Sequence, residues 1–185
     1  MSKSVLLSIK PKYCELISSG KKTIEVRKTK PKLDTPFKCY IYCTKDKGIS
    51  FWTGKRYAYA DDRSHNLFDV CGNGKVIGEF VCDTIITDCT FGHDQMFKAL
   101  SCMSDAEIGS YCTANEMYGF HISDLVIYDK PKDLDCFMAF GKSNCDCKNC
   151  DNCWYMSIDG VCDIKDRYQP LFRPPQSWGY VEELR

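Results

Sequence analysis

Residues 4–28, SVLLSIKPKYCELISSGKKTIEVRK, predict a strand, a short helix and a second strand in close succession. Residues 4–9 form an apolar run that is typical of a short buried strand. The helix is expected to begin at Lys10-Pro11, because proline suits the first helical turn, and to end at Gly20, where a left-handed residue is favoured. Residues 22–28 then alternate between apolar and polar side chains, which indicates a strand with two different faces.

The predicted helix has one apolar face and one end suited to an anion. Leu16 and Ile17 follow Tyr13 by three and four residues, which predicts a single apolar stripe along the helix. The helix N-terminus has backbone N–H groups without intrahelical partners, and such groups suit a phosphate. Lys10 and Lys12 flank this end, which adds positive charge to it.

The second strand and the turn before it bring together three kinds of polar side chain. Thr23, Glu25 and Arg27 are expected on one strand face, where a hydroxyl, a carboxylate and a guanidinium can read a base edge and hold a phosphate. Lys21 and Lys22 in the turn add two cations. The alternative is an exposed strand face with an ordinary Glu–Arg pair, worth less than ~1 kcal/mol.

The rest of the chain is rich in predicted strands and has no internal repeat or linker. Strands are expected over 37–44, 75–87 and 118–129, the last as a strand pair or one bent strand, with Gly78 marking a bulge. Residues 93–103 look helical, and Ser104 to Glu107 fit a capping box for a further short helix. We therefore predict a single α+β domain over residues 1–185, with two insertions at about 45–74 and 141–170.

Charge is unevenly distributed along a chain whose formal net charge is zero. The first 47 residues contain twelve Lys/Arg and four Asp/Glu, so the remaining residues carry the balancing negative charge. A basic first quarter can steer a polyanion to one face, although a lysine-rich solvated surface would give the same count.

The 14 cysteines are expected to be mostly reduced thiols in the cytoplasm. The N-terminus lacks the apolar segment and cleavage site of a secretory signal, and no stretch approaches the ~20 apolar residues of a membrane span. Cys39, Cys43 and Cys82 occupy strand-like apolar positions, which predicts that they are small core residues.

The segment SIKPKYCELISSGKKTIEVRKTKP resembles the opening of ASCH domains, a branch of the PUA-like superfamily. Three later stretches, KVIGEF (75–80), YGFHISDL (118–125) and RPPQSWGYVEEL (173–184), are also similar and occur in the expected order. The resemblance implies a small β-barrel flanked by short helices, with a cleft lined by the GKKTIEVR segment. It also implies that the cleft binds RNA or a modified nucleotide.

Some ASCH relatives are hydrolases that deacylate N4-acetylcytidine with a lysine, a threonine and a distal glutamate. By resemblance Lys22 matches the lysine, whereas Glu25 stands where these relatives have the threonine, and Thr23 is the nearby hydroxyl. The hydrolase mechanism needs a nucleophile with an adjacent base. Because Glu25 replaces the expected threonine, we expect little or no amidohydrolase activity here. Glu79, Glu107 and Glu116 are the candidates for the distal glutamate.

Two further features have alternative interpretations. Trp178 could stack on a base or pack as a plug of the barrel. The second insertion concentrates thiols in a polar stretch, which predicts a structural metal site, with zinc ahead of iron, or else reduced free thiols. A metal-stabilised module for protein interaction is therefore a third functional hypothesis. The candidate ligands are Cys145, Cys147, Cys150, Cys153 and Cys162.

Overall fold

The computed structural model describes residues 3–58, 67–88, 95–111, 116–139 and 169–184. Its largest element is a seven-stranded sheet with the order β11-β10-β12-β1-β3-β6-β9, in which only β1 and β3 are parallel neighbours. The strands of this sheet are β1 (Lys3–Ile9), β3 (Phe37–Cys43), β6 (Val76–Cys82), β9 (Ser123–Lys132), β10 (Met138–Ala139), β11 (Gln169–Pro170) and β12 (Trp178–Glu182).

Two smaller sheets and four short helices accompany the large sheet among the described residues. A three-stranded sheet has the order β2-β8-β7, and an antiparallel pair, β4 and β5, lies within residues 45–74. The smaller strands are β2 (Ile24–Arg27), β4 (Trp52–Ala58), β5 (Leu67–Cys71), β7 (Ile85–Asp88) and β8 (Met117–His121). The helices are α1 (Pro11–Ser18), α2 (Gln95–Ser101), α3 (Asp105–Tyr111) and the single-turn η1 (Leu134–Cys136).

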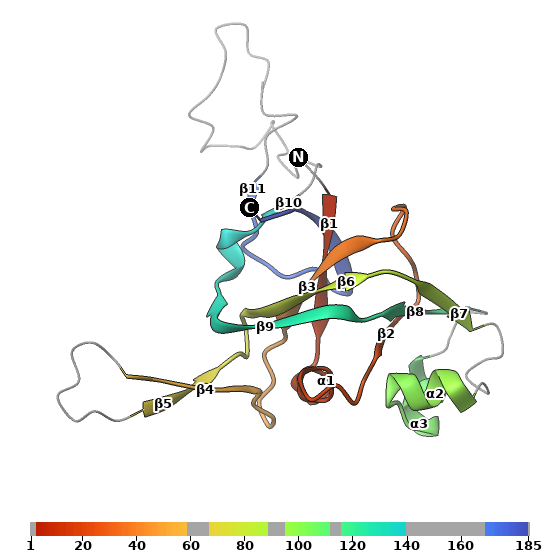
Figure 1. The fold of residues 1–185 in the computed structure, drawn as a ribbon, viewed down its shortest axis with the longest axis horizontal. Helices are drawn as coiled ribbons and strands as arrows, with labels where there is room; N and C mark the ends of the chain where they lie inside the picture. Colours follow the sequence, from red (N-terminus) through yellow and green to blue (C-terminus); the bar gives the residue numbers. More distant parts are fainter. Residues whose placement is uncertain (1–2, 59–66, 89–94, 112–115, 140–168, 185) are drawn as a thin grey trace, which may run out of the picture.

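The fold is α+β, as predicted, but the described strands do not close into a barrel. The large sheet curls so strongly that β9 runs nearly across β1, yet its order ends at β11 and β9 (Figure 1). The chain leaves this sheet after β6 and returns only at β9, because β7 and β8 pair with β2 in the smaller sheet. The predicted small barrel is therefore not confirmed, and the strand-rich core is divided between sheets.

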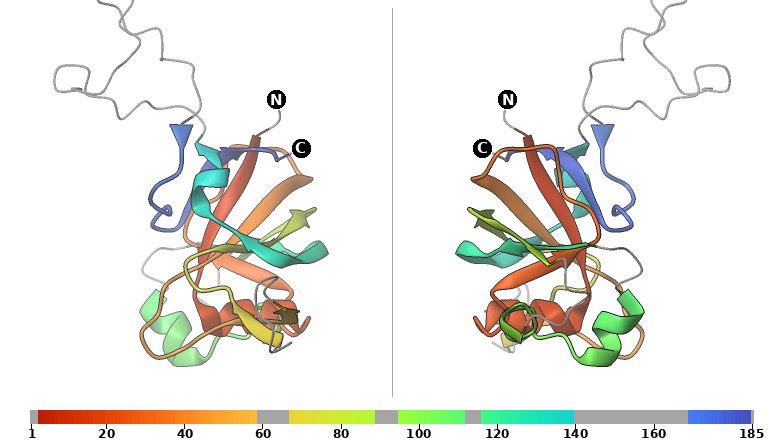
Figure 2. Two further views of the ribbon diagram at one scale, coloured as in Figure 1. Left: turned by 90° about the vertical axis from the view of Figure 1, so that its left-hand side faces the viewer. Right: turned by 90° about the vertical axis from the view of Figure 1, so that its right-hand side faces the viewer.

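Helices α1, α2 and α3 gather at one end of the curled sheet, opposite the two chain ends (Figure 2). Helix α1 begins with Pro11 after the cap residue Lys10, and Gly20 follows it with φ +72°, both as predicted. Gly20 N–H donates to Ile17 O and Lys21 N–H donates to Leu16 O, a pair of bonds that satisfies the last carbonyls of the helix. The turn that follows reverses the chain into β2, so the start of α1 and β2 lie close together.

Buried apolar clusters form on both faces of the large sheet, the smaller one around Leu6 and Tyr40. Val5, Leu7, Cys39, Ile41 and Phe120 belong to one fully buried cluster, which Cys14 and Ile17 of α1 join. Cys39, Cys43 and Cys82 are all buried, so the prediction that they are core residues is confirmed.

Helices α2 and α3 cover the small sheet with a separate apolar cluster that contains Ile24, Val26, Phe97 and Ile108. The predicted capping box precedes α3: Glu107 N–H donates to Ser104 Oγ, while Ser104 N–H donates to Glu107 Oε2 at 2.9 Å. Within the described residues, no helix is long and apolar enough to cross a lipid bilayer.

Candidate functional site

A cavity of about 750 Å³ lies between the start of α1, the end of β1, the strand β2 and helix α3. Segments far apart in the sequence meet here, since Gln176 and Ser177 before β12 also line it. Its charged lining consists of five cations and three carboxylates, a surplus of two positive charges. These residues are Lys10, Lys12, Lys22, Arg27, Lys28, Glu25, Asp46 and Glu107.

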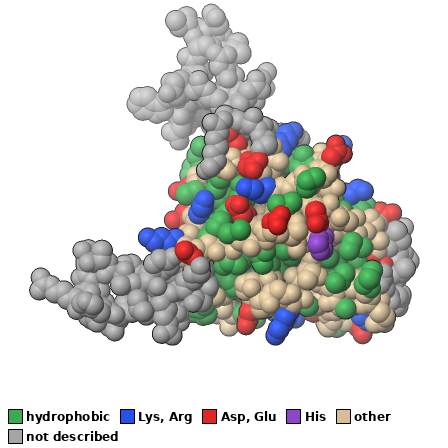
Figure 3. Space-filling view, in the orientation of Figure 1, with side chains coloured by type: hydrophobic (Ala, Val, Ile, Leu, Met, Phe, Trp, Pro, Cys, Tyr) green, Lys and Arg blue, Asp and Glu red, His purple; other side chains and the backbone are tan. Residues whose placement is uncertain are grey.

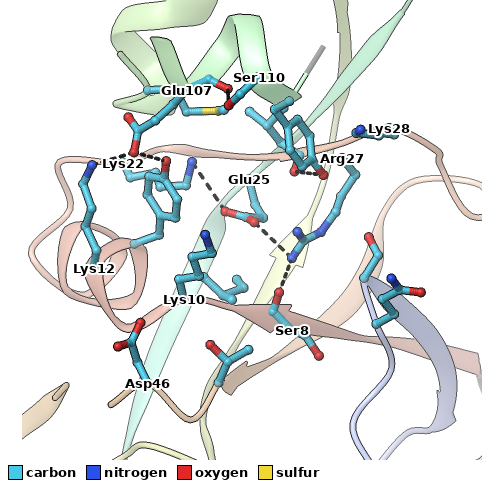
Figure 4. Close-up of a pocket in the computed structure, with 18 of the residues that line it drawn as sticks. Ser8, Lys10, Lys12, Lys22, Glu25, Arg27, Lys28, Asp46, Glu107 and Ser110 are labelled. Atoms are coloured by element: carbon cyan, nitrogen blue, oxygen red, sulfur yellow. Dashed lines mark hydrogen bonds and ion pairs between the residues drawn. The ribbon is translucent and has the colours of Figure 1, made fainter. Parts of the chain in front are cut away.

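Three charged side chains form a buried row on the cavity wall (Figure 4). Lys22 Nζ lies 3.4 Å from Glu25 Oε2, and Arg27 Nη2 lies 3.0 Å from Glu25 Oε1. Lys22, Glu25 and Arg27 are only 2%, 4% and 7% exposed, respectively. Two cations and one anion are therefore almost completely shielded from water. We call Lys22, Glu25 and Arg27 the buried charge row.

Backbone carbonyls hold the two cations of this row in place. Lys22 Nζ donates to Ser101 O at 2.7 Å, and Arg27 Nη2 donates to Ser8 O at 2.9 Å. Two buried atoms of the row have no hydrogen-bond partner among the described residues, namely Glu25 Oε2 and Arg27 Nε. The row therefore keeps hydrogen-bonding capacity and one unbalanced positive charge beside the cavity.

A second cluster joins α1 to α3 at the edge of the cavity. The Tyr13 hydroxyl donates to Glu107 Oε1 at 2.8 Å, and Lys12 Nζ lies 2.7 Å from the same oxygen. Lys22 Nζ lies 4.8 Å from the centre of the Tyr13 ring, so Tyr13 connects this cluster to the buried charge row. Burial, and then the hydrogen bond to Glu107, raise the pKa of Tyr13 above its ordinary value, which keeps the hydroxyl protonated as a donor.

Glu107 is held ionised by its neighbours. The hydrogen bond from Lys12 is the largest cause that lowers the pKa of Glu107, followed by those from Ser104 and Tyr13. Because this pKa is lower in the folded protein than in the unfolded chain, the contribution of Glu107 to stability is complete above about pH 4.3 and declines below it.

We expect Glu107→Ala to lower the free energy of unfolding by about 1 kcal/mol at pH 7, since it removes half of the capping box and an interhelical contact. Urea unfolding at several pH values measures this effect. The difference from the wild type should shrink as the pH falls below about 4. Glu107→Gln preserves the shape of the cap and should cost less; a pH-independent difference for Glu107→Ala would contradict the role of the carboxylate.

The structure brings together five of the eight residues predicted to bind nucleic acid. Those lining the cavity are Lys10, Lys12, Lys22, Glu25 and Arg27. Lys21, Thr23 and Trp178 do not line it. Lys21 is exposed outside the cavity, and Thr23 precedes β2 with its hydroxyl buried and without a hydrogen-bond partner among the described residues.

Trp178 is half-buried in β12 and packs on the core. Its Nε1–H donates to Thr29 Oγ1 at 3.0 Å, and its ring meets the Tyr180 ring edge-on at 5.4 Å between centroids.

Sequence reasoning missed the contribution of Tyr13 and Ser8 to the site. It had placed Glu107 as a helix cap and as one of three candidates for a distal glutamate. Tyr13 was assigned to the apolar stripe alone, yet its hydroxyl is the group that reaches α3. Of the three candidates for a distal glutamate, only Glu107 lines the cavity. Glu79 pairs with Lys38, and Glu116 accepts a hydrogen bond from Tyr118, both outside the cavity.

The predicted cysteine cluster at 145–162 lies outside the described residues. Within the part of the chain that the structure describes, no group of three or more His, Cys, Asp or Glu side chains is arranged to hold a metal ion. The zinc site stays a prediction from the sequence.

Comparison with known proteins places this architecture in a family. A crystal structure of ASCH from Zymomonas mobilis is 16% identical, with a TM-score of 0.54 over 97% of this chain and 88% of that chain. A crystal structure of a variant of the same protein, with tyrosine replaced by phenylalanine, gives a TM-score of 0.58 at 17% identity, covering 98% and 92% of the two chains. A search of curated proteins found no match. The ASCH domain family model matches residues 7–127, more than half of the chain, and this protein therefore belongs to the ASCH domain family.

Proposed function

We propose that this ASCH domain binds RNA or an anionic nucleotide in the cavity beside β1, α1 and β2. The observation that supports this most is the charge of the cavity lining, where a buried row with one surplus cation is joined by the exposed Lys10 and Lys12. A cation away from water is costly unless an anion compensates it. A phosphate or another anionic group of a ligand would supply that compensation.

Lys10 is the cation best suited to bind the anion. It is exposed at the cap position of α1 and lines the cavity, and no ion-pair partner is found for it in the described part of the chain. Lys12, by contrast, is already paired with Glu107. An incoming phosphate would meet Lys10 without having to break an existing salt bridge.

We expect Lys10→Gln to weaken binding of a nucleoside monophosphate roughly tenfold, since a hydrogen bond to a charged group contributes about 1.5 kcal/mol. Titration calorimetry with the four common ribonucleoside monophosphates and a short single-stranded RNA measures this. Lys21→Gln is the matched control, because Lys21 carries the same charge on the same segment but lies outside the cavity. Equal losses for both variants, or no binding of any of these ligands at millimolar concentration, would overturn the proposal.

The hydrolase alternative has less support. The Thr23 hydroxyl does not line the cavity, and Glu25 occupies the strand position between the two buried cations, where it serves as their shared counter-ion. A carboxylate held between two cations is a weak nucleophile, so we keep the expectation of little or no release of cytidine from N4-acetylcytidine.

A further inference from the structure

We infer that the cavity is one end of a longer binding track, and that single-stranded RNA continues from it along an adjoining surface. This inference rests on the proposed function, because it assumes that a nucleotide occupies the cavity. The surface, which we call the basic–aromatic strip, consists of Lys28, Lys30, Lys32, Tyr118, Trp178 and Tyr180.

The strip is continuous with the cavity. Lys28 and Thr29 line the cavity, and Thr29 Oγ1 accepts the hydrogen bond from Trp178 Nε1 at 3.0 Å. Farther along the segment, Lys32 N–H donates to the Tyr180 hydroxyl at 2.7 Å. These two bonds fix residues 29–32 alongside β12. An RNA strand that extends from the cavity past Lys28 therefore meets Trp178 and then Tyr180.

The lysines of the strip lie at the surface of the segment 28–32. Lys28, Lys30 and Lys32 are all exposed, whereas Pro31 is buried. The buried proline anchors the segment while the flanking ammonium groups remain at the surface. Phosphates of an extended strand can therefore approach these lysines without any change in the fold.

The aromatic members of the strip, Tyr118, Trp178 and Tyr180, are half-buried. Trp178 and Tyr180 are two residues apart on β12, hence on the same face, and their rings lie 5.4 Å apart at an interplanar angle of 77°. Lys30 Nζ lies 5.3 Å from the centre of the Tyr118 ring. Lys3 Nζ likewise lies 5.6 Å from the centre of the Tyr180 ring, so a base that stacks on either tyrosine would displace a flexible lysine side chain. Bases stack on such rings while cations follow the phosphates.

An unpaired strand fits this surface better than a duplex or an acidic peptide. Stacking requires bases that are not already paired, which double-stranded RNA does not offer. An acidic peptide would use the lysines but not the aromatic rings. The face drawn in Figure 3 has acidic and basic side chains interspersed.

The test is a length series of single-stranded RNA from one to eight nucleotides, measured with wild-type protein and two double variants. Lys30→Gln with Lys32→Gln should leave mononucleotide binding unchanged and weaken octamer binding roughly tenfold. It should also lower the slope of log affinity against log salt by about 1.4, since each phosphate contact on a single strand contributes about 0.7. Lys45→Gln with Lys47→Gln removes the same charge from exposed positions outside the strip and should change neither quantity.

Tryptophan fluorescence gives a second readout. Replacing Trp52 and Trp154 with phenylalanine leaves Trp178 as the only tryptophan of three, and its emission should be quenched by the octamer but not by a mononucleotide. Equal affinity for the dinucleotide and the octamer would contradict the proposed role of the strip. Equal losses of octamer affinity in the two double variants would contradict it as well. If octamer binding depends on Lys30 and Lys32 but not on Lys10, the proposed function of the cavity fails, and the strip binds RNA without being a continuation of the cavity.

Discussion

Glu25→Ala is expected to lower the free energy of unfolding by about 3–5 kcal/mol, because it leaves two buried cations without their counter-ion. In the folded protein the carboxylate lies 3.4 Å from Lys22 Nζ and 3.0 Å from Arg27 Nη2, and all three side chains are more than nine-tenths buried. Loss of Glu25 would leave Lys22 and Arg27 facing each other in a region of low dielectric constant. Urea unfolding of the ligand-free protein at pH 7 measures the effect.

Two further variants separate charge from packing at this position. Glu25→Gln retains the size of the side chain and one acceptor oxygen, so it should lose less than Glu25→Ala but still lose stability. Glu15→Ala removes an equal charge from an exposed position of α1 and should change the free energy of unfolding by less than about 0.5 kcal/mol. If Glu25→Ala were as mild as Glu15→Ala, the buried charge row would not be the structural unit described above.

The cost of this row bears on function. A buried ion pair is seldom more stabilising than apolar side chains of the same volume, because removing both charges from water offsets their attraction. The row also leaves Glu25 Oε2 and Arg27 Nε without hydrogen-bond partners among the described residues. An arrangement of this kind is poorly explained by stability alone, and its position on a cavity wall favours a role in binding an anion.

The local features of the fold were predictable because their causes are local in sequence. Pro11 and Gly20 fix the two ends of α1, and Ser104 and Glu107 cap α3 through contacts three residues apart. The division of the strands between sheets could not be predicted in this way. Strand β8 pairs with β2, about a hundred residues away, and nothing within YGFHISDL shows that Ile122 separates a strand of the small sheet from one of the large sheet.

The site was predictable to the extent that it depends on the alternation of β2. Glu25 and Arg27 share a face, as their spacing requires, and that face lines the cavity. Which lysine of the turn enters the cavity depends on the bonds that end α1: Lys22 N–H donates to Leu16 O, and the Lys22 side chain is buried whereas that of Lys21 is exposed. The contacts of Tyr13 and Arg27 with Glu107 and Ser8 depend on tertiary packing, for which adjacent sequence holds no signal.

Gly78 connects the sequence prediction to the geometry of the large sheet. The register of β6 shifts between Val76 and Gly78 relative to both of its neighbours, so the predicted bulge is confirmed. A Cβ atom at Gly78 would lie 2.3 Å from the backbone oxygen of Val126 and 3.2 Å from Ile127 Cα. Neither atom can move aside as a flexible side chain would, so β6 and β9 approach each other as closely as they do only because residue 78 is glycine.

We therefore expect Gly78→Ala to lower the free energy of unfolding by about 3 kcal/mol, at the upper end of the usual cost of overpacking. Gly109→Ala is the matched control, since a Cβ at this position of α3 meets nothing within 4 Å and alanine is the better helix former. That variant should gain roughly 0.5–1 kcal/mol. Urea denaturation of the two variants beside the wild type decides the matter. A loss below about 1 kcal/mol for Gly78→Ala would show that β6 and β9 can separate at little cost, and that their close approach does not depend on the glycine.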